Sequence, residues 1–402
     1  VVGSFLRKDH PLFSARLRLA ARRGGQISRI HASDDDWLMP LHAQQLVAPA
    51  GFVGALAQVA VAVARAKGVS PPEALASIEP GAAAQCVAES LLRGERKAIL
   101  LGNLAVQHPQ ASQLRALAHW IAQAVGSSCG DLTEAANTVG AYLAHAVPGA
   151  AGLNARSMLQ QPRQAYVLLN VEPALDCADA AEADAALRAA AFVVALTPFK
   201  SAAAEHAHVM LPISPFTETS GTFINAEGRV QSFHGVVRPL GDTRPGWKVL
   251  RVLGNLLGVK GMEFDTSEAV RDELLNAVSI DERLKTSGEH AHTLQSIKVN
   301  AAPLQRVADV PIYAADILVR RAPALQMTAD ACATVAALPT SLYRQLGLGE
   351  NARVRVSSAS GSVELPARAS DALPADAVRV PAGLAETAAL GPMFGALVVE
   401  KA

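Results

Sequence analysis

The strongest constraint on the fold is a repeated order of short apolar strand, amphipathic helix and glycine stop. Residues 98–102 form an apolar run that ends in glycine, and residues 113–125 carry apolar side chains at spacings of three and four. Gly126 follows at the position where helices commonly end. Because consecutive parallel strands need a crossover connection, usually a helix, this order predicts a βαβ unit.

The same order recurs along the first half of the chain and predicts an α/β fold of Rossmann-like, doubly wound parallel sheets. Only 4% of the residues are aromatic although 50% are hydrophobic, so we expect cores of alanine, valine and leucine between helices and buried strands. A chain of 402 residues is long enough for two or three domains. Further strands and helices are predicted at residues 1–3, 12–21, 27–30, 165–169, 182–190 and 192–196.

The composition of the sequence changes after Pro212. Residues 217–231 are polar and punctuated by glycine, which predicts a long loop with a short hairpin, and residues 245–257 predict a helix opened by Pro245. Short alternating runs near the end of the chain, such as 353–356, predict a small C-terminal β-barrel. We therefore expect an α/β domain over 1–85, a second over 86–258, an irregular connector over 259–330 and the barrel over 331–402.

Charge and cysteine spacing exclude several classes of site. The chain has 36 basic residues (lysine and arginine) and 36 acidic residues (aspartate and glutamate). It therefore has no net charge that would attract nucleic acid or an anionic membrane surface. Cys86, Cys129, Cys177 and Cys332 lie far apart, without the short spacing that holds an iron-sulfur cluster or zinc. We therefore expect isolated, buried thiols in a reducing compartment.

One apolar stretch, residues 46–64, approaches the length of a membrane span. Pro49 and Gly51 shorten the helix and Gln58 interrupts its apolar surface, so we expect a buried helix over 52–66, no span and no signal peptide. The first residue is valine, and residues 1–3 resemble the end of a strand. We therefore expect the chain to begin inside a domain, with further sequence upstream.

Several short motifs suggest chemistry but also have ordinary structural interpretations. Identical Glu-His-Ala-His tetrapeptides at 205–208 and 289–292 invite a metal hypothesis, yet side chains two apart diverge on a helix, so no metal site is expected. Three consecutive aspartates at 34–36 are expected to cap a helix or face solvent. Gly102-Asn103 follows a strand but lacks a phosphate-binding glycine pattern, and no Gly-x-Ser-x-Gly motif supports hydrolysis.

The polar loop carries a specific family resemblance. Residues 207–212 (AHVMLP) and the loop up to Gln231 resemble a signature of the molybdopterin oxidoreductase superfamily, in which Ala-Asp-Val-Val-Leu-Pro precedes Glu, Gly-Thr and Asn-x-Glu-Gly-Arg-x-Gln. The resemblance extends from Gly3 and His10-Pro11, through residues 136–141, to a tail that resembles the dinucleotide-binding barrel. Within the superfamily, residues 6–11 and 235–250 are most similar to the C-terminal region of the large iron-sulfur (G) subunit of bacterial NADH-quinone oxidoreductases.

Three departures from the superfamily pattern bear on the cofactor. Where active members carry Gly-x-Asn, Asp-Pro-Arg and Pro-Gly-Thr-Asp, this chain reads Gly3-Ser4-Phe5, His31-Ala32-Ser33 and Pro49-Ala50-Gly51-Phe52. The charged and polar partners of a phosphate- and guanine-bearing cofactor are thereby replaced. Each hydrogen bond to a charged group contributes roughly 1.5 to 3 kcal/mol, so we expect no bound pterin cofactor and no catalytic residue in this segment.

The polar loop could nevertheless be a vestigial binding pocket, because ligands of parallel sheets bind beyond the carboxyl ends of the strands. The alternative is that its side chains knit the loop together through hydrogen bonds. The candidate residues are Glu218, Gly221, Thr222, Asn225, Glu227, Gly228 and Arg229.

The resemblance implies a scaffold role in an electron-transferring subunit. It implies 2Fe-2S and 4Fe-4S clusters upstream, partner subunits in the peripheral arm of the respiratory complex, and a place on the cytoplasmic side of the bacterial inner membrane, without membrane insertion or nucleic acid. The activity would then belong to the whole complex, as electron transfer from NADH to quinone coupled to proton translocation. Two alternatives stay open: a catalytic molybdopterin oxidoreductase such as a formate dehydrogenase, and a free-standing nucleotide-binding or protein-interaction module.

Overall fold

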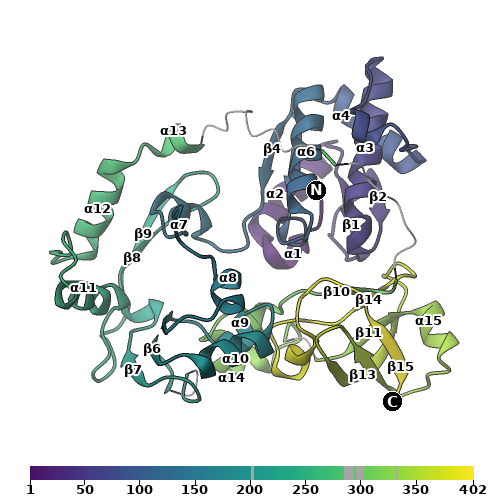
Figure 1. Ribbon diagram of the computed structural model, residues 1–402. Helices are drawn as coiled ribbons and strands as arrows, with labels where there is room; N and C mark the ends of the chain where they lie inside the picture. Colours follow the sequence, from purple (N-terminus) through teal and green to yellow (C-terminus); the bar gives the residue numbers. More distant parts are fainter. Residues whose placement is uncertain (201–202, 285–293, 296–302, 332) are drawn as a thin grey trace. The chain divides into compact units, whose positions relative to one another are not determined.

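The computed structural model describes residues 1–200, 203–284, 294–295, 303–331 and 333–402. The chain forms two compact units (Figure 1). Unit 1 comprises Val1–Glu134, Ser287–Ile312 and Cys332–Ala402, and unit 2 comprises Ala135–Thr286 and Tyr313–Ala331. The boundaries of these units differ from those of the four expected segments, because stretches far apart in the sequence pack into one core. The predicted α/β class with parallel sheets is confirmed.

The parallel sheet of unit 1 is centred on Val2. Strands β1 (Ser28–His31) and β2 (Ala43–Leu46) pair in parallel, as do β3 (Ala98–Leu101) and β4 (Ser128–Asp131). Val2 forms parallel bridges to both Ile30 of β1 and Leu101 of β3. The spatial order is therefore β2-β1-Val2-β3-β4, the doubly wound order that the repeated βαβ pattern predicts.

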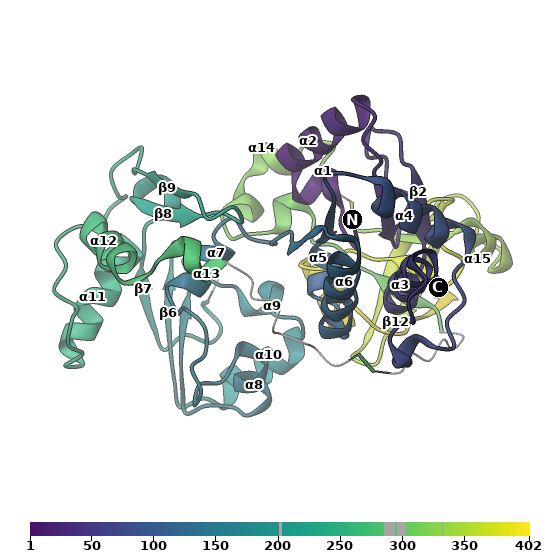
Figure 2. The same cartoon turned by 90° about the horizontal axis from the view of Figure 1, so that it is seen from above.

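Helices cover both faces of this sheet (Figure 2). Neighbouring side chains on β3 point to opposite faces: Leu101 belongs to the core formed with α3 (Phe52–Lys67), α4 (Ala82–Arg93) and α6 (Ala111–Val125), whereas Leu100 packs near Trp37 and α2 (Pro11–Arg22). Burial on both faces explains why β3 is an unbroken apolar run.

Helix α3 is the helix expected from the apolar stretch at 46–64. With the 3-10 turn before it, residues 49–67 are long and apolar enough to cross a membrane by length and composition alone. Within unit 1, however, most of this segment is buried, and α3 packs against α4 and α6. The helix ends at Gly68, whose φ of 67° is a left-handed cap.

The C-terminal part of unit 1 is a curled six-stranded sheet rather than the expected barrel (Figure 1). Its spatial order is β10-β14-β11-β13-β12-β15, around a core that includes Val354, Val356 and Leu365. The edge strands do not pair with each other: a single bridge joins Gln305 of β10 to Ala396, just before β15 begins. The strands are β10 (Gln305–Val307), β11 (Ala336–Pro339), β12 (Arg353–Ser357), β13 (Ser362–Ser370), β14 (Ala377–Arg379) and β15 (Val398–Lys401).

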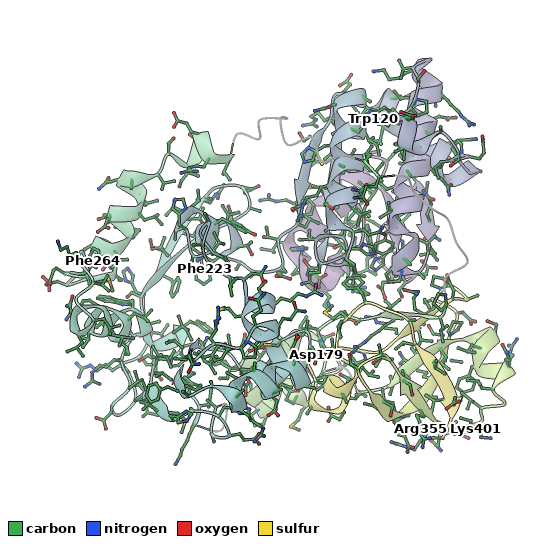
Figure 3. All side chains as sticks on the ribbon, viewed as in Figure 1. Trp120, Asp179, Phe223, Phe264, Arg355 and Lys401 are labelled. Carbon is green, nitrogen blue, oxygen red and sulfur yellow. The ribbon has the colours of Figure 1, made fainter. Side chains whose placement is uncertain are left out.

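Unit 2 contains a parallel three-stranded sheet, in the order β5 (Ala165–Leu169), β6 (Phe192–Thr197) and β7 (Val209–Pro212). Helix α10 (Ala180–Ala189) crosses over between β5 and β6, and Asp179, labelled in Figure 3, caps it by accepting from Glu182 N at 3.0 Å. An antiparallel hairpin of β8 (Gly221–Ile224) and β9 (Val230–Phe233) follows, as predicted. Two longer helices, α11 (Gly246–Leu256) and α12 (Ser267–Ala277), and the short α13 (Ile280–Leu284) follow the hairpin.

A partly buried ion-pair cluster links the segment 313–331 to the rest of unit 2. Arg320 and Arg321 donate to the carboxylate of Glu172 at 2.9 and 2.5 Å, and Arg320 also donates to Asp176. Burial would raise the pKa of Glu172, but the two arginines outweigh it and lower that pKa. The cluster thus joins chain segments almost 150 residues apart.

Candidate functional site

The carboxyl edge of the unit 1 sheet is the first candidate, because it contains the switch point of a doubly wound fold. Val2 lies between β1 and β3, and the chain leaves these three neighbouring strands at Gly3, Ala32 and Gly102. In open α/β sheets, ligands bind in the crevice where the strand order reverses. A nucleotide-like group would therefore lie against these three segments.

The backbone at this edge is already hydrogen-bonded to itself. Gly102 N donates to Val2 O at 2.7 Å, and Leu104 N donates to Gly3 O at 2.9 Å. Gly3 has a φ of 62°, and a Cβ there would lie 2.7 Å from Ala105 N, while a Cβ on Gly102 would lie 2.3 Å from the Ser4 Cβ. The glycines therefore permit close packing of the chain on itself, and these amides are not left for a phosphate.

The ring of Phe5 fills the space next to this edge. Phe5 is 5% exposed, and the His31 ring approaches it edge-on with 4.7 Å between centroids. Two cations also lie over the Phe5 ring, Lys8 Nζ at 4.9 Å and Arg379 Cζ at 4.6 Å from its centroid. An aromatic side chain thus stands among charged groups at the position where active family members carry asparagine.

Those charged groups form a continuous chain of ion pairs, which a histidine-carboxylate contact extends to His31. Lys8 Nζ lies 2.8 Å from Asp309, Arg379 lies 3.0 Å from Asp309 and 3.1 Å from Asp35, and His31 Nε2 lies 3.3 Å from Asp35. We call these five residues together with Phe5 the strand-end cluster. Each cation in it is already matched by a carboxylate of the same cluster.

The electrostatics of the strand-end cluster follow from this pairing. Burial would raise the pKa of Asp35, but the hydrogen bond with His31 and the charge of Arg379 lower it to about 2. Burial likewise opposes ionisation of Asp309, and Arg379 with Lys8 overcomes it, so the pKa of Asp309 is also lowered. Burial lowers the pKa of His31, and Asp35 opposes that effect only in part. At neutral pH the imidazole is therefore uncharged and both carboxylates are ionised.

The three consecutive aspartates were expected to cap a helix or face solvent: Asp34 and Asp36 are indeed exposed, but Asp35 is partly buried at this edge. Asp35 joins the strand-end cluster, and Asp34 accepts a hydrogen bond from Arg29. Arg29 is 2% exposed, stacks on Trp37 with its Cζ 5.2 Å from the ring centroid, and also donates to Gln44 at 2.8 Å. Arg29 occupies a strand position, and its buried guanidinium needs these partners.

The substituted family positions meet at the same edge. Phe5 and His31 touch each other, and Phe52 is fully buried with its ring 3.0 Å from the Cβ position of Gly3. Several polar atoms here are buried without a hydrogen-bond partner among the described residues, among them Ser4 Oγ, His31 Nδ1, Asn103 Oδ1 and, next to Asn103, His10 Nε2. None of them belongs to a guanidinium or a backbone amide, so they do not replace the donors that a phosphate requires. The residues at this edge do not fit a phosphate-bearing pterin dinucleotide.

The second candidate is the hairpin of unit 2, where the family signature lies. Asn225 Oδ1 accepts hydrogen bonds from the backbone amides of Glu227 at 3.0 Å and Arg229 at 2.9 Å. Glu218 accepts from Leu240 N at 3.0 Å, and Thr222 Oγ1 lies 3.0 Å from Ser232 Oγ. These polar groups therefore shape the hairpin and its flanking turn.

The glycines of the hairpin also have packing roles. A Cβ on Gly221 would lie 2.6 Å from the Phe233 ring, and a Cβ on Gly228, which has a φ of 78°, would lie 2.4 Å from Leu284. Asn137, at the start of α7 (Thr138–Leu143), accepts from Ile224 N of β8 at 2.9 Å. The loop at residues 136–141, which the family resemblance includes, and the polar loop of the signature are thus in direct contact in unit 2, through residues 87 positions apart.

One tetrapeptide lies in a group of possible metal ligands. His206 Nε2 lies 3.3 Å from Asp184, with Glu205 close by. Arg188 also donates to Asp184 at 2.8 Å and lies 3.9 Å from Glu205, so a guanidinium already provides positive charge to both carboxylates. His208 does not join the group and instead accepts from Val193 N. The second tetrapeptide, at 289–292, lies outside the described residues.

The cysteines do not form a cluster in the described part of the chain. Cys129 and Cys177 are partly buried. Burial is the main reason why the pKa of both thiols is raised, to about 11 for Cys129. Cys86 is exposed, so the expectation of a buried thiol is wrong there, because it lies on the outer face of α4. Cys332 lies outside the described residues.

Comparison with known proteins identifies the family of this architecture. The model of the molybdopterin oxidoreductase family matches residues 1–256. The G subunits of the NADH-quinone oxidoreductases of Mycobacterium bovis and of Mycobacterium tuberculosis are each 27% identical over 337 residues, which cover 75% of this chain and 40% of each relative. The chain thus spans less than half the length of these relatives.

Two further similarities broaden the comparison. A provisionally named formate dehydrogenase of Staphylococcus aureus is 36% identical over 88 residues, which cover 22% of this chain and 8% of that protein. The structure of acetylene hydratase from Pelobacter acetylenicus matches with a TM-score of 0.70 and 13% identity, and covers all of this chain and 77% of the other. The structural likeness concerns the fold alone.

Proposed function

The chain belongs to the molybdopterin oxidoreductase family, and from that premise we propose that it is part of the large iron-sulfur (G) subunit of an NADH-quinone oxidoreductase, where it acts as a scaffold without a pterin cofactor. The breadth of the similarity supports this assignment: it extends over three quarters of this chain, whereas the formate dehydrogenase similarity covers about a fifth. In this proposal the chain supports electron-carrying parts and has no catalytic residue of its own.

The strand-end cluster is the observation that carries the scaffold role. A phosphate at this edge would displace the Phe5 ring and would face Asp35 and Asp309, which are negatively charged at neutral pH. The cations that could attract it, Lys8 and Arg379, are neutralised by those same carboxylates. Binding would therefore cost both buried contacts and ion pairs, and we derive no chemical step through a pterin group.

The proposal places this chain in a larger assembly. The iron-sulfur clusters that carry electrons would be held by cysteines elsewhere in the full-length protein, because the described cysteines here are single and free. The partners would be other subunits of the peripheral arm on the cytoplasmic side of the membrane. The activity, oxidation of NADH coupled to quinone reduction and proton translocation, would belong to the complex.

A catalytic molybdopterin oxidoreductase of the formate dehydrogenase kind is the second candidate. The local identity of 36% to the Staphylococcus aureus protein favours it. This function requires a bound pterin with its metal, so the two candidates differ in a measurable property of the purified protein.

Metal and pterin analysis of the full-length protein tests the proposal. We expect iron, but no molybdenum, tungsten or pterin above the level of a control protein purified in the same way. A tagged copy expressed in its own host is expected to purify with NADH-oxidising, quinone-reducing activity. Stoichiometric molybdenum or tungsten would overturn the scaffold role. Purification as a single polypeptide with formate-oxidising activity would overturn the assignment to the respiratory complex.

A further inference from the structure

A groove on unit 1 lies apart from the strand-end cluster, between α2 and the segment that contains Trp37 and Leu38. Its volume is about 500 Å³, which falls in the range of ligand sites. Arg7, Arg18 and Arg22 line it together with Leu19, Trp37 and Leu38. The groove therefore combines three guanidinium groups with an apolar surface.

The positive charge of this groove is largely uncompensated. Helix α2 carries Arg18 and Arg22, which line the groove, but no acidic residue. Arg7 has a carboxylate neighbour, Asp36, at 4.0 Å, and both of those side chains are well exposed. In the part of the chain that the structure describes, Arg18 and Arg22 form no salt bridge. Because the whole chain has no net charge, this positive patch is a local feature.

Two buried donors at the groove lack an acceptor. Trp37 is 3% exposed, and its indole Nε1 has no hydrogen-bond partner among the described residues. The Nε of Arg18 is also buried without a partner. Buried N–H groups are nearly always paired, so these two donors, in residues that line one groove, are available to an acceptor that enters it.

The rim of the groove is apolar. Leu19 is 49% exposed and Leu38 is 46% exposed, and Leu12, about two helical turns before Leu19 on α2, is 83% exposed. The Trp37 ring itself is covered, partly by the stacked guanidinium of Arg29, so a nucleotide base would find no aromatic face to stack on. An occupant that is both anionic and aliphatic fits this combination better than a nucleotide does.

We propose that this groove binds an acidic peptide segment of a partner protein. A carboxylate of the segment would accept hydrogen bonds from Arg18 and Trp37 Nε1, with Arg22 adding charge, and an aliphatic neighbour would pack against Leu19 and Leu38. The inference goes beyond the proposed function and does not depend on it, because a partner subunit could dock here in either kind of oxidoreductase.

Titration with labelled peptides tests the proposal on the full 402-residue chain. The probe is acetyl-Glu-Leu-Asp-Leu-Glu amide, and its controls are the Gln-Leu-Asn-Leu-Gln and Glu-Gly-Asp-Gly-Glu versions. In a Trp120→Phe/Trp247→Phe background, Trp37 is the sole remaining tryptophan, so its fluorescence reports occupancy of the groove. We expect the probe to bind, and both controls to bind about tenfold more weakly or worse.

Matched arginine variants locate the binding. Arg18→Ala/Arg22→Ala is expected to weaken binding by about tenfold or more, whereas Arg96→Ala/Arg344→Ala, which removes the same charge from exposed sites elsewhere on unit 1, should change it by less than about twofold. The proposal would be overturned if both double variants weakened binding of the probe equally. It would also be overturned if the probe bound with a Kd above about 1 mM, or if the uncharged peptide bound as tightly as the probe. A change in Trp37 fluorescence caused by inorganic phosphate or ADP, at lower concentrations than the peptide requires, would also overturn the proposal, in favour of a phosphate site.

Discussion

The strand-end cluster of unit 1 is held by buried groups from distant parts of the chain, whereas the hairpin of unit 2, apart from the hydrogen bond between Asn137 and Ile224, is shaped mainly by hydrogen bonds between near neighbours. Lys8 and Asp309 are 301 residues apart, and Asp35 and Arg379 are 344 apart. Asn225, in contrast, bonds to amides two and four residues away. Polar residues of the first region therefore tie separate segments into one core, and those of the second shape a local turn. The same substitution should have different consequences in the two regions.

The largest difference is expected for phenylalanine truncation. Phe5→Ala removes a buried ring at the strand ends, and we expect it to lower the free energy of unfolding by about 4 kcal/mol. Phe223 on the hairpin (Figure 3) is 40% exposed and makes an edge-on contact with Phe233, so Phe223→Ala should cost about 1 kcal/mol. Urea unfolding of both variants measures the two costs. Similar values would show that the strand ends are no better packed than the hairpin.

Loss of Arg379 is expected to have the next largest effect. Arg379→Ala would leave Asp309, which is 6% exposed, without its closest guanidinium, and we expect a loss of about 3 kcal/mol in the free energy of unfolding. The matched control is Arg355→Ala, which breaks an exposed pair with Glu364 on the outer surface of the C-terminal sheet. This control should leave the unfolding midpoint almost unchanged. A small effect for Arg379→Ala would mean that Lys8 alone compensates Asp309.

Much of this architecture could be predicted from local patterns. The apolar runs of β3, β5 and β6 and the periodic helices α3 and α6 lie where hydrophobic spacing indicates them. Strands β2 (AQQL) and β4 (SCGD) gave no such signal, because they are the outermost strands of the unit 1 sheet and carry polar residues. Whether the C-terminal sheet closes depends on long-range pairing between its edges, which no local pattern records.

The candidate site was predictable to a smaller extent. The family resemblance identified Phe5, His31 and Phe52 as replaced positions, and the structure brings them to one edge. The resemblance gave no reason to connect Lys8 with Asp309 or Asp35 with Arg379, because ion pairs between residues hundreds of positions apart leave no periodic pattern in the sequence. The run of aspartates at 34–36 was a usable signal: consecutive carboxylates after a strand that contains Arg29 suggest compensation of a buried cation.

Acid sensitivity provides a third test of the difference between the regions. The pKa of Asp35 is lowered from 3.8 to about 2 in the folded chain, so this carboxylate stabilises the fold above about pH 4 and loses that effect as the pH falls towards 2. The difference corresponds to about 2 kcal/mol. Asp35→Asn should therefore be less stable than the parent at neutral pH and should lose less stability between about pH 5 and about pH 2.5. Parallel pH profiles for the two proteins, measured by urea unfolding, would contradict this role of Asp35.

The smallest effect is expected at the hairpin and should stay local. Asn225→Ala removes the acceptor for the amides of Glu227 and Arg229, and we expect a cost of about 1 kcal/mol that appears as faster hydrogen exchange at these two amides. Asn225→Asp keeps an acceptor at the same position and should restore slow exchange. Amides of the unit 1 core, such as that of Leu104, should exchange at the parental rate in both variants. If Asn225→Ala instead accelerated exchange throughout unit 1, the hairpin would contribute to global stability, and its contrast with the strand-end cluster would not hold.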